Sequence, residues 1–112
     1  MRIYVSGKMS GVPELNRPKF EKARKEILAF LPDAEIIIPH ELELEKMVDE
    51  TDESWYARLL LNDLETIRYV DTVVVLDDWE KSNGATVEAM FAIAVGVPVK
   101  TLGKFIIEEG AQ

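Results

Sequence analysis

The chain has 112 residues, 47% of them hydrophobic, and it contains no cysteine. This length fits a single domain, residues 1–112, with a core of its own, and the lack of cysteine excludes disulfides and thiolate metal sites. The 21 acidic and 13 basic residues give a net charge of −8, which argues against a nucleic-acid partner because such binding draws on clustered Lys and Arg. A nucleoside or mononucleotide needs only a few local donors and stays compatible with this charge.

The first residues favour a cytoplasmic protein. Residues 2–6 predict a short strand that runs into a glycine loop, where a signal peptide would carry a long apolar core. No apolar run reaches the roughly 20 residues that span a bilayer, so no membrane partner is expected. With one histidine and no cysteine, neither a metal ion nor another cofactor is expected.

Apolar periodicity predicts alternating strands and helices along the chain. After the strand at residues 2–6, a helix capped by Asn16, with Pro18 in its first turn, is expected to run to about Leu31. The elements expected next are a strand at 34–38, an acidic excursion at 41–53, a helix at 54–70, a strand at 71–76, a loop at 77–82, a helix at 84–95 and a strand at 97–102. The acidic excursion is interpreted as a solvated segment, with a Mg²⁺ site as the alternative. The residues from Gly103 onward give no clear pattern.

This order of elements predicts an α/β fold. Right-handed crossovers between apolar strands give a three-layer flavodoxin-like or Rossmann-like sandwich with a parallel sheet of four or five strands. Ligands in such sheets bind beyond the carboxyl ends of the strands, near the switch in strand order. Two loops rich in small polar residues, 6–11 and 77–84, follow strands and are the expected binding loops.

The loop after the first strand is a candidate phosphate site. Gly7 and Gly11 bracket Ser6, Lys8 and Ser10, and consecutive backbone N–H groups in such a loop can form an anion nest. The spacing matches neither the P-loop nor G-x-G-x-x-G. A phosphate site and a purely structural turn are both compatible with it.

Two carboxylates occur on helices that are otherwise apolar where they face the core. Glu88 is the only ionisable residue between Ser82 and Val99, and burying a lone carboxylate is costly without a functional reason. The alternative is that Glu88 faces solvent or caps a neighbouring N–H. Asp63 falls in the middle of the apolar arc of its helix, so it either pairs with a buried arginine or points into a site. His40 is interpreted as a turn residue.

Four motifs resemble the nucleoside 2-deoxyribosyltransferase superfamily between Ile3 and about Val99: I-Y-V-S-G-K-M-S-G, N-D-L, D-T-V-V-V-L and S-N-G-A-T-V-E-A. The patterns Y-x-x-G-x-M-x-G and W-E-x-S-x-G-A-x-x-E are similar to a small phage and bacterial branch, related to the deoxynucleoside 5′-monophosphate N-hydrolases. This branch often has glycine where the present chain has Asp78.

The resemblance implies an activity at the glycosidic bond. Glu88, four residues after Gly84, would be the nucleophile, Tyr4 would orient it, and Asp63 would protonate the leaving base. Substrate binding is assigned to residues of the two loops: Ser6, Gly7, Lys8, Met9, Ser10, Gly11, Asp77, Trp79, Ser82 and Gly84. Ser82 stands where the transferases carry an aspartate for a free 5′-hydroxyl, and a serine there suits a 5′-phosphate.

The expected function is therefore that of a nucleotide N-glycosidase, a hydrolase that cleaves a (deoxy)nucleoside 5′-monophosphate through a glycosyl-enzyme on Glu88. The alternatives are base exchange, as in the transferases, and a non-catalytic nucleotide-binding or sensing module on the same fold. Trp55, Tyr56 and Leu61 exceed the apolar needs of one helix face, which predicts a homodimer or larger homo-oligomer.

Overall fold

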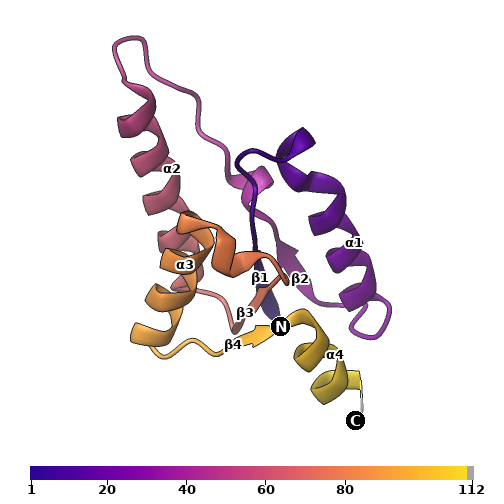
Figure 1. The fold of residues 1–112 in the computed structure, drawn as a ribbon. Helices are drawn as coiled ribbons and strands as arrows, with labels where there is room; N and C mark the ends of the chain where they lie inside the picture. Colours follow the sequence, from indigo (N-terminus) through magenta and orange to yellow (C-terminus); the bar gives the residue numbers. More distant parts are fainter. Residues whose placement is uncertain (111–112) are drawn as a thin grey trace.

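A computed structural model describes residues 1–110 as one parallel sheet covered by helices on both faces (Figure 1). Its strands are β1 (Arg2–Ser6), β2 (Glu35–Ile37), β3 (Thr72–Val75) and β4 (Val99–Thr101), in the order β2-β1-β3-β4. The helices are α1 (Arg17–Leu28), α2 (Asp52–Ile67), α3 (Asn83–Ala94) and α4 (Leu102–Gly110). Short 3-10 turns lie at Pro13–Asn16, Pro39–Leu42 and Trp79–Lys81. The predicted flavodoxin-like α/β sandwich is confirmed, with four strands.

The helices divide into two layers because the chain changes direction across the sheet. From β1 it moves to β2 at one edge, then crosses back over β1 to β3 and on to β4. Right-handed crossovers in opposite directions place their helices on opposite faces. In Figure 1, α1 and α4 accordingly lie on one side of the sheet, and α2 and α3 on the other.

Side chains of the strands alternate between two apolar cores, as the pleat requires. Ile3 and Val5 pack with Phe20, Ile27 and Phe105 under α1 and α4. The other core, under α2 and α3, contains Tyr4, Ile67, Val73, Val75 and Ala89. Tyr4 and Ser6 share a face of β1 through this alternation, and they face α3.

Several element boundaries differ from the sequence expectation. The first helix ends at Leu28 instead of about Leu31, and the second and fourth strands cover only Glu35–Ile37 and Val99–Thr101. Helix α2 begins at Asp52 and ends at Ile67, two to three residues before its predicted bounds. The segment after Gly103, which gave no pattern, continues α4.

Asn16 occupies the predicted N-cap position of α1, but the capping bond expected from its side chain is not made. Asn16 precedes α1 but has a left-handed backbone with φ of 61°, and its side chain makes no capping bond. Glu14 and Leu15 are left-handed too, with φ of 57° and 52°, a conformation that non-glycine residues seldom adopt. A hydrogen bond of 2.8 Å between the His40 Nε2 atom and the Leu15 carbonyl oxygen holds this turn against the turn at Pro39–Leu42.

The acidic excursion forms a loop that projects with the start of α2 beyond the sheet (Figure 1). The loop closes on itself, because Arg58 donates to Glu50 at 2.7 Å and the Trp55 indole N–H donates to the Leu44 carbonyl at 2.7 Å. Among residues 1–110, no three His, Cys, Asp or Glu side chains are placed to hold a metal ion together. Within the same range, no helix has the length and apolar character that crossing a membrane requires.

Candidate active site

Glu88 is buried at the junction of α3 with β1, and its side chain is only 4% exposed. The Tyr4 hydroxyl donates to Oε2 at 2.8 Å, and the Ser6 hydroxyl donates to Oε1 at 2.7 Å. Each carboxylate oxygen therefore receives one hydrogen bond from β1. The predicted contact between the Tyr4 hydroxyl and a carboxylate of the site is confirmed.

Asp63 on α2 forms an electrostatically linked pair with Glu88. Burial and, after it, the negative charge of Glu88 together raise the pKa of Asp63 to about 8. Burial also raises the pKa of Glu88, against the lowering effect of hydrogen bonds from Ser6, Asp63 and Tyr4. The hydroxyl donors stabilise the charged form of Glu88, so the pair holds its shared proton preferentially on Asp63.

Tyr4 stays a neutral donor in this arrangement. Burial raises its pKa well above the ordinary value, and the charges of Glu88 and Asp63 raise it further. Its hydroxyl proton is therefore available to Glu88 throughout the range in which the protein would work.

Both carboxyl groups open into a cleft of about 890 Å³ at the carboxyl edge of the sheet. Of the residues predicted for the site, the cleft is lined by Gly7, Met9, Ser10, Asp63, Ser82, Gly84 and Glu88. Its other lining residues are Leu15, Pro39, Leu42, Glu43, Leu44, Glu45, Asp52, Trp55, Tyr56, Leu59, Leu60 and Ala85. Strands β1 and β3 are neighbours in the sheet and lead to opposite helix layers, so the cleft lies at the switch point where ligand binding was expected.

Six residues predicted for the site lie outside the lining of this cleft. Tyr4 and Ser6 are behind Glu88, where they hold its carboxylate. The other four are placed as follows: the Lys8 N–H donates to Asp78, Gly11 lies in an exposed turn, Asp77 pairs with Lys19, and Trp79 packs against the core under α2 and α3. Because the Lys8 N–H already has an anionic partner, the expected anion nest does not form with that donor.

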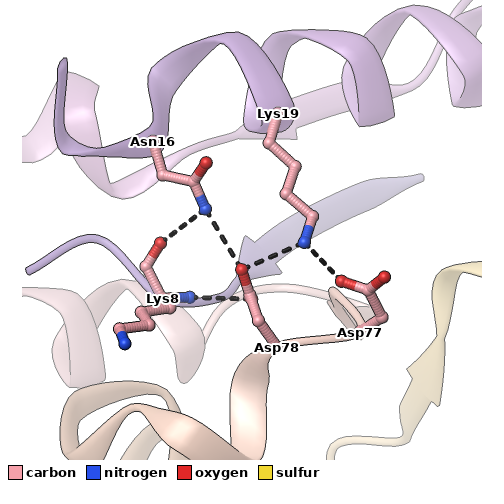
Figure 2. Close-up of polar contacts among 5 residues, drawn as sticks. All are labelled: Lys8, Asn16, Lys19, Asp77 and Asp78. Carbon is pink, nitrogen blue, oxygen red and sulfur yellow. Dashed lines mark hydrogen bonds and ion pairs between the residues drawn. The ribbon is translucent and has the colours of Figure 1, made fainter. Parts of the chain in front are cut away.

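Asp78 is the centre of a polar cluster that sequence reasoning did not single out for the site (Figure 2). Its Oδ1 atom accepts from the Lys8 N–H at 3.0 Å, and its Oδ2 atom accepts from the Asn16 amide at 3.1 Å and from Lys19 at 3.0 Å. Asn16 also donates to the Lys8 carbonyl at 2.8 Å. The cluster thus joins the glycine loop, the left-handed turn and the loop after β3.

Ser82 and Gly84 define the start of α3 in the cleft wall. The Ser82 hydroxyl oxygen accepts from the Ala85 N–H at 3.1 Å, so Ser82 is the N-cap of the helix. A hydroxyl that accepts in this way keeps its own hydrogen for another acceptor. A Cβ atom at Gly84 would meet the Tyr56 hydroxyl at 2.9 Å, so α2 and α3 approach closely there.

The structure is therefore an α/β sandwich with a pair of carboxyl groups, Glu88 and Asp63, in a cleft at its switch point. The chain matches the family described as domain of unknown function (DUF4406) over residues 1–101, and it belongs to that family.

Among solved structures, the chain is similar to a 2-deoxyribosyltransferase from the psychrotolerant bacterium Bacillus psychrosaccharolyticus, which is described as a biocatalyst for the synthesis of nucleosides. The TM-score is 0.67 at 21% identity, with 90% of this chain and 71% of that chain covered. This likeness shows a common fold, in agreement with the resemblance carried by the motifs. No curated protein matches the chain.

Proposed function

We propose that this protein cleaves the glycosidic bond between base and sugar in a nucleoside or nucleotide. The observation that carries the proposal is the Glu88 carboxylate, held by Tyr4 and Ser6 at 2.8 and 2.7 Å and opening with Asp63 into one cleft. Two carboxyl groups whose environments favour different protonation states suit paired nucleophilic and acid roles.

In the first half of the proposed reaction, a Glu88 oxygen attacks the anomeric carbon as the bond to the base nitrogen breaks. The Asp63 proton passes to the leaving base, and the negative charge of Glu88 stabilises the positive charge that develops on the sugar. The product is a glycosyl ester on Glu88 and a free base. In the second half, Asp63 accepts a proton from water, and the resulting attack releases the sugar and regenerates Glu88.

Our first candidate is hydrolysis of a (deoxy)nucleoside 5′-monophosphate. Ser82 lies in the cleft lining six residues before Glu88, and its hydroxyl hydrogen is free to meet an anionic oxygen. The start of α3 adds a partial positive charge at the same place. Both features favour a negatively charged group at the sugar's 5′ end.

The second candidate is base transfer between nucleosides, and the charge of the cleft favours it. Glu43, Glu45 and Asp52 lie in the lining with Asp63 and Glu88, and that lining contains no Lys or Arg. A phosphate dianion would approach these carboxylates without a cationic partner. The solved structure of similar fold is described as a 2-deoxyribosyltransferase, a biocatalyst for the synthesis of nucleosides.

Free base released from a panel of nucleosides and their 5′-monophosphates, measured by chromatography, tests the proposal. Glu88→Gln keeps the shape of the side chain and removes the nucleophile, so we expect base release to fall by at least about 10³-fold with the fold retained. Glu80→Gln, an exposed change on the 3-10 turn before α3, is the matched control. Turnover of Glu88→Gln near that of the unchanged protein would assign the chemistry elsewhere.

Adding a second free base to the reaction separates the two candidates. Appearance of a new nucleoside identifies transfer, whereas sugar phosphate as the sole second product identifies hydrolysis. Tight nucleotide binding without base release under any condition would indicate a binding module instead of an enzyme.

A further inference from the structure

Tyr56 is a cleft residue whose hydroxyl group occupies its position because Gly84 has no side chain. Its hydroxyl oxygen lies 2.9 Å from the point where a Cβ atom of Gly84 would stand, and the Ser82 hydroxyl oxygen lies 3.9 Å from the same point. Both side chains line the cleft. The absence of a side chain at Gly84 therefore allows two hydroxyl groups to flank the start of α3.

Each of these hydroxyl groups has a hydrogen to donate. Ser82 uses its oxygen as an acceptor for the Ala85 N–H, and among residues 1–110 neither hydroxyl donates to another group. Burial raises the pKa of Tyr56, and the charges of Glu88 and Asp63 raise it further, so the phenol remains protonated. A neutral hydroxyl donor beside two carboxyl groups suits an oxygen acceptor of a substrate.

We propose that Tyr56 is a specificity-determining residue whose hydroxyl, together with that of Ser82, holds the oxygen substituent at the sugar's 5′ end. This inference rests on the proposed function, because that function places the anomeric carbon at Glu88. Gly84 is four residues before Glu88, which corresponds to about 6 Å along the helix. That axial spacing is of the same order as the length of a pentose from its anomeric carbon to the substituent on its exocyclic carbon.

The geometry also explains why position 84 is glycine. A methyl group there would meet the Tyr56 hydroxyl at 2.9 Å but the ring carbon that bears it only at 4.0 Å, which is ordinary contact. The clash would therefore involve the terminal atom of a side chain that can move. Gly84→Ala should displace the hydroxyl and leave the helices in place.

The experiment compares Tyr56→Phe with the unchanged protein on a nucleoside, its 5′-monophosphate and its 5′-deoxy analogue. We expect kcat/KM for the substrates with a 5′ oxygen to fall about five- to tenfold, the effect of one lost neutral hydrogen bond. The 5′-deoxy analogue should be a poor substrate for both proteins and should react equally with each. Tyr69→Phe, an exposed tyrosine beyond the end of α2, is the matched control.

Gly84→Ala provides a second, independent test. Alone it should reduce kcat/KM about as much as Tyr56→Phe, and the double variant should lose little more than either single variant. Equal losses on all three substrates, or additive losses in the double variant, would overturn the assignment of Tyr56 while leaving the proposed function intact.

The affinities of Glu88→Gln for the nucleoside and its 5′-deoxy analogue, measured by calorimetry, test this inference separately from catalysis. If the unchanged protein releases no base, the proposed function fails. The role of Tyr56 would still be supported if Glu88→Gln binds the nucleoside more tightly than its 5′-deoxy analogue and this preference decreases in Glu88→Gln/Tyr56→Phe. Equal affinity of Glu88→Gln for the nucleoside and its analogue would overturn it.

Discussion

The protonation states of buried Glu88 and half-buried Asp63 follow from their immediate neighbours. Glu88 receives hydroxyl hydrogen bonds on both oxygens, and these favour its charged form. Burial of Asp63 and, after it, the adjacent negative charge of Glu88 favour the protonated form of Asp63 by raising its pKa. In the proposed reaction, these environments suit Glu88 to act as the nucleophile and Asp63 to act as the acid.

The pH dependence of activity should reveal the pKa values of Glu88 and Asp63. The proposed reaction requires ionised Glu88 and protonated Asp63, so kcat/KM should rise with an apparent pKa above the ordinary glutamate value and fall with one near 8. In Asp63→Asn, activity should be lower and the fall on the alkaline side should vanish. Rates measured from pH 5 to 10 check this, and an unchanged alkaline limb in Asp63→Asn would assign that pKa to another group.

The raised pKa of Asp63 also predicts how stability changes with pH. Folding raises this pKa from 3.8 to about 8, so between these values the folded state binds more protons than the unfolded state. The stabilisation is complete below the unfolded value and is lost as pH rises toward 8.

Asp63→Asn removes this loss, because an amide does not ionise. The variant should gain stability over the unchanged protein between pH 5 and pH 8, by about 1–3 kcal/mol, since water reaches part of the side chain and reduces the full effect of the shift. Urea unfolding at the two pH values measures the difference. A stability difference that does not depend on pH would contradict the assigned direction.

At the scale of elements, Asp78 connects three segments: the glycine loop, the left-handed turn before α1 and the loop after β3. Asp78→Asn replaces an acceptor oxygen with an amide that faces the donors Lys19, Asn16 and the Lys8 N–H. We expect a loss of about 1–3 kcal/mol in the free energy of unfolding. Asp77→Asn is the stability control, because this side chain is 86% exposed and pairs with Lys19 alone.

Limited proteolysis locates the effect of Asp78→Asn. Cleavage should increase within residues 7–16, because the cluster holds the glycine loop and the left-handed turn. Equal unfolding free energies for Asp78→Asn and Asp77→Asn would show that the cluster contributes nothing beyond a surface ion pair.

The order and type of the elements could be predicted from the sequence because the strands are continuous apolar runs and the helices have apolar faces. The C-terminal end of α1 and the side-chain partners of Asn16 could not. An asparagine before Pro18 fits a cap by local rules, but its amide meets the Lys8 carbonyl and Asp78 instead. Those partners are brought together by the parallel pairing of β1 and β3, which local sequence does not encode.

Some residues of the candidate site could likewise be predicted from the sequence, and others could not. Glu88 and Asp63 could be identified because a lone carboxylate on an apolar helix face is costly to bury. Tyr56 was interpreted as an oligomer contact, since nothing in its own helix reveals that it reaches Gly84. The sequence singled out Gly84, but the reason for a glycine there is Tyr56, which is 28 positions away on another helix.

At the scale of the whole molecule, the outer surface of α2 and α3 carries large apolar side chains. Leu61, Met90 and Ile93 are 65%, 51% and 58% exposed. Trp55 and Tyr56, which were also expected at an oligomer contact, line the cleft, and Tyr56 is 47% exposed. The remaining surface still supports the prediction of a symmetric homodimer.

Sedimentation at micromolar concentration tests the homodimer. The unchanged protein should sediment as a dimer, and Met90→Glu or Ile93→Glu should shift it to monomer because a buried charge without a partner opposes association. Lys22→Glu, on the exposed side of α1, is the control. A monomeric unchanged protein would contradict the prediction.

The fixed orientation of Glu88 has a stereochemical consequence. Because β1 binds both oxygens from behind, the carboxylate presents itself to the sugar only from the cleft. Displacement of the base from one face and of Glu88 from the other inverts the anomeric centre twice, which restores the original configuration. With methanol as acceptor, a β-nucleoside should therefore yield the β-methyl glycoside, which the anomeric proton signal in an NMR spectrum distinguishes from its α epimer.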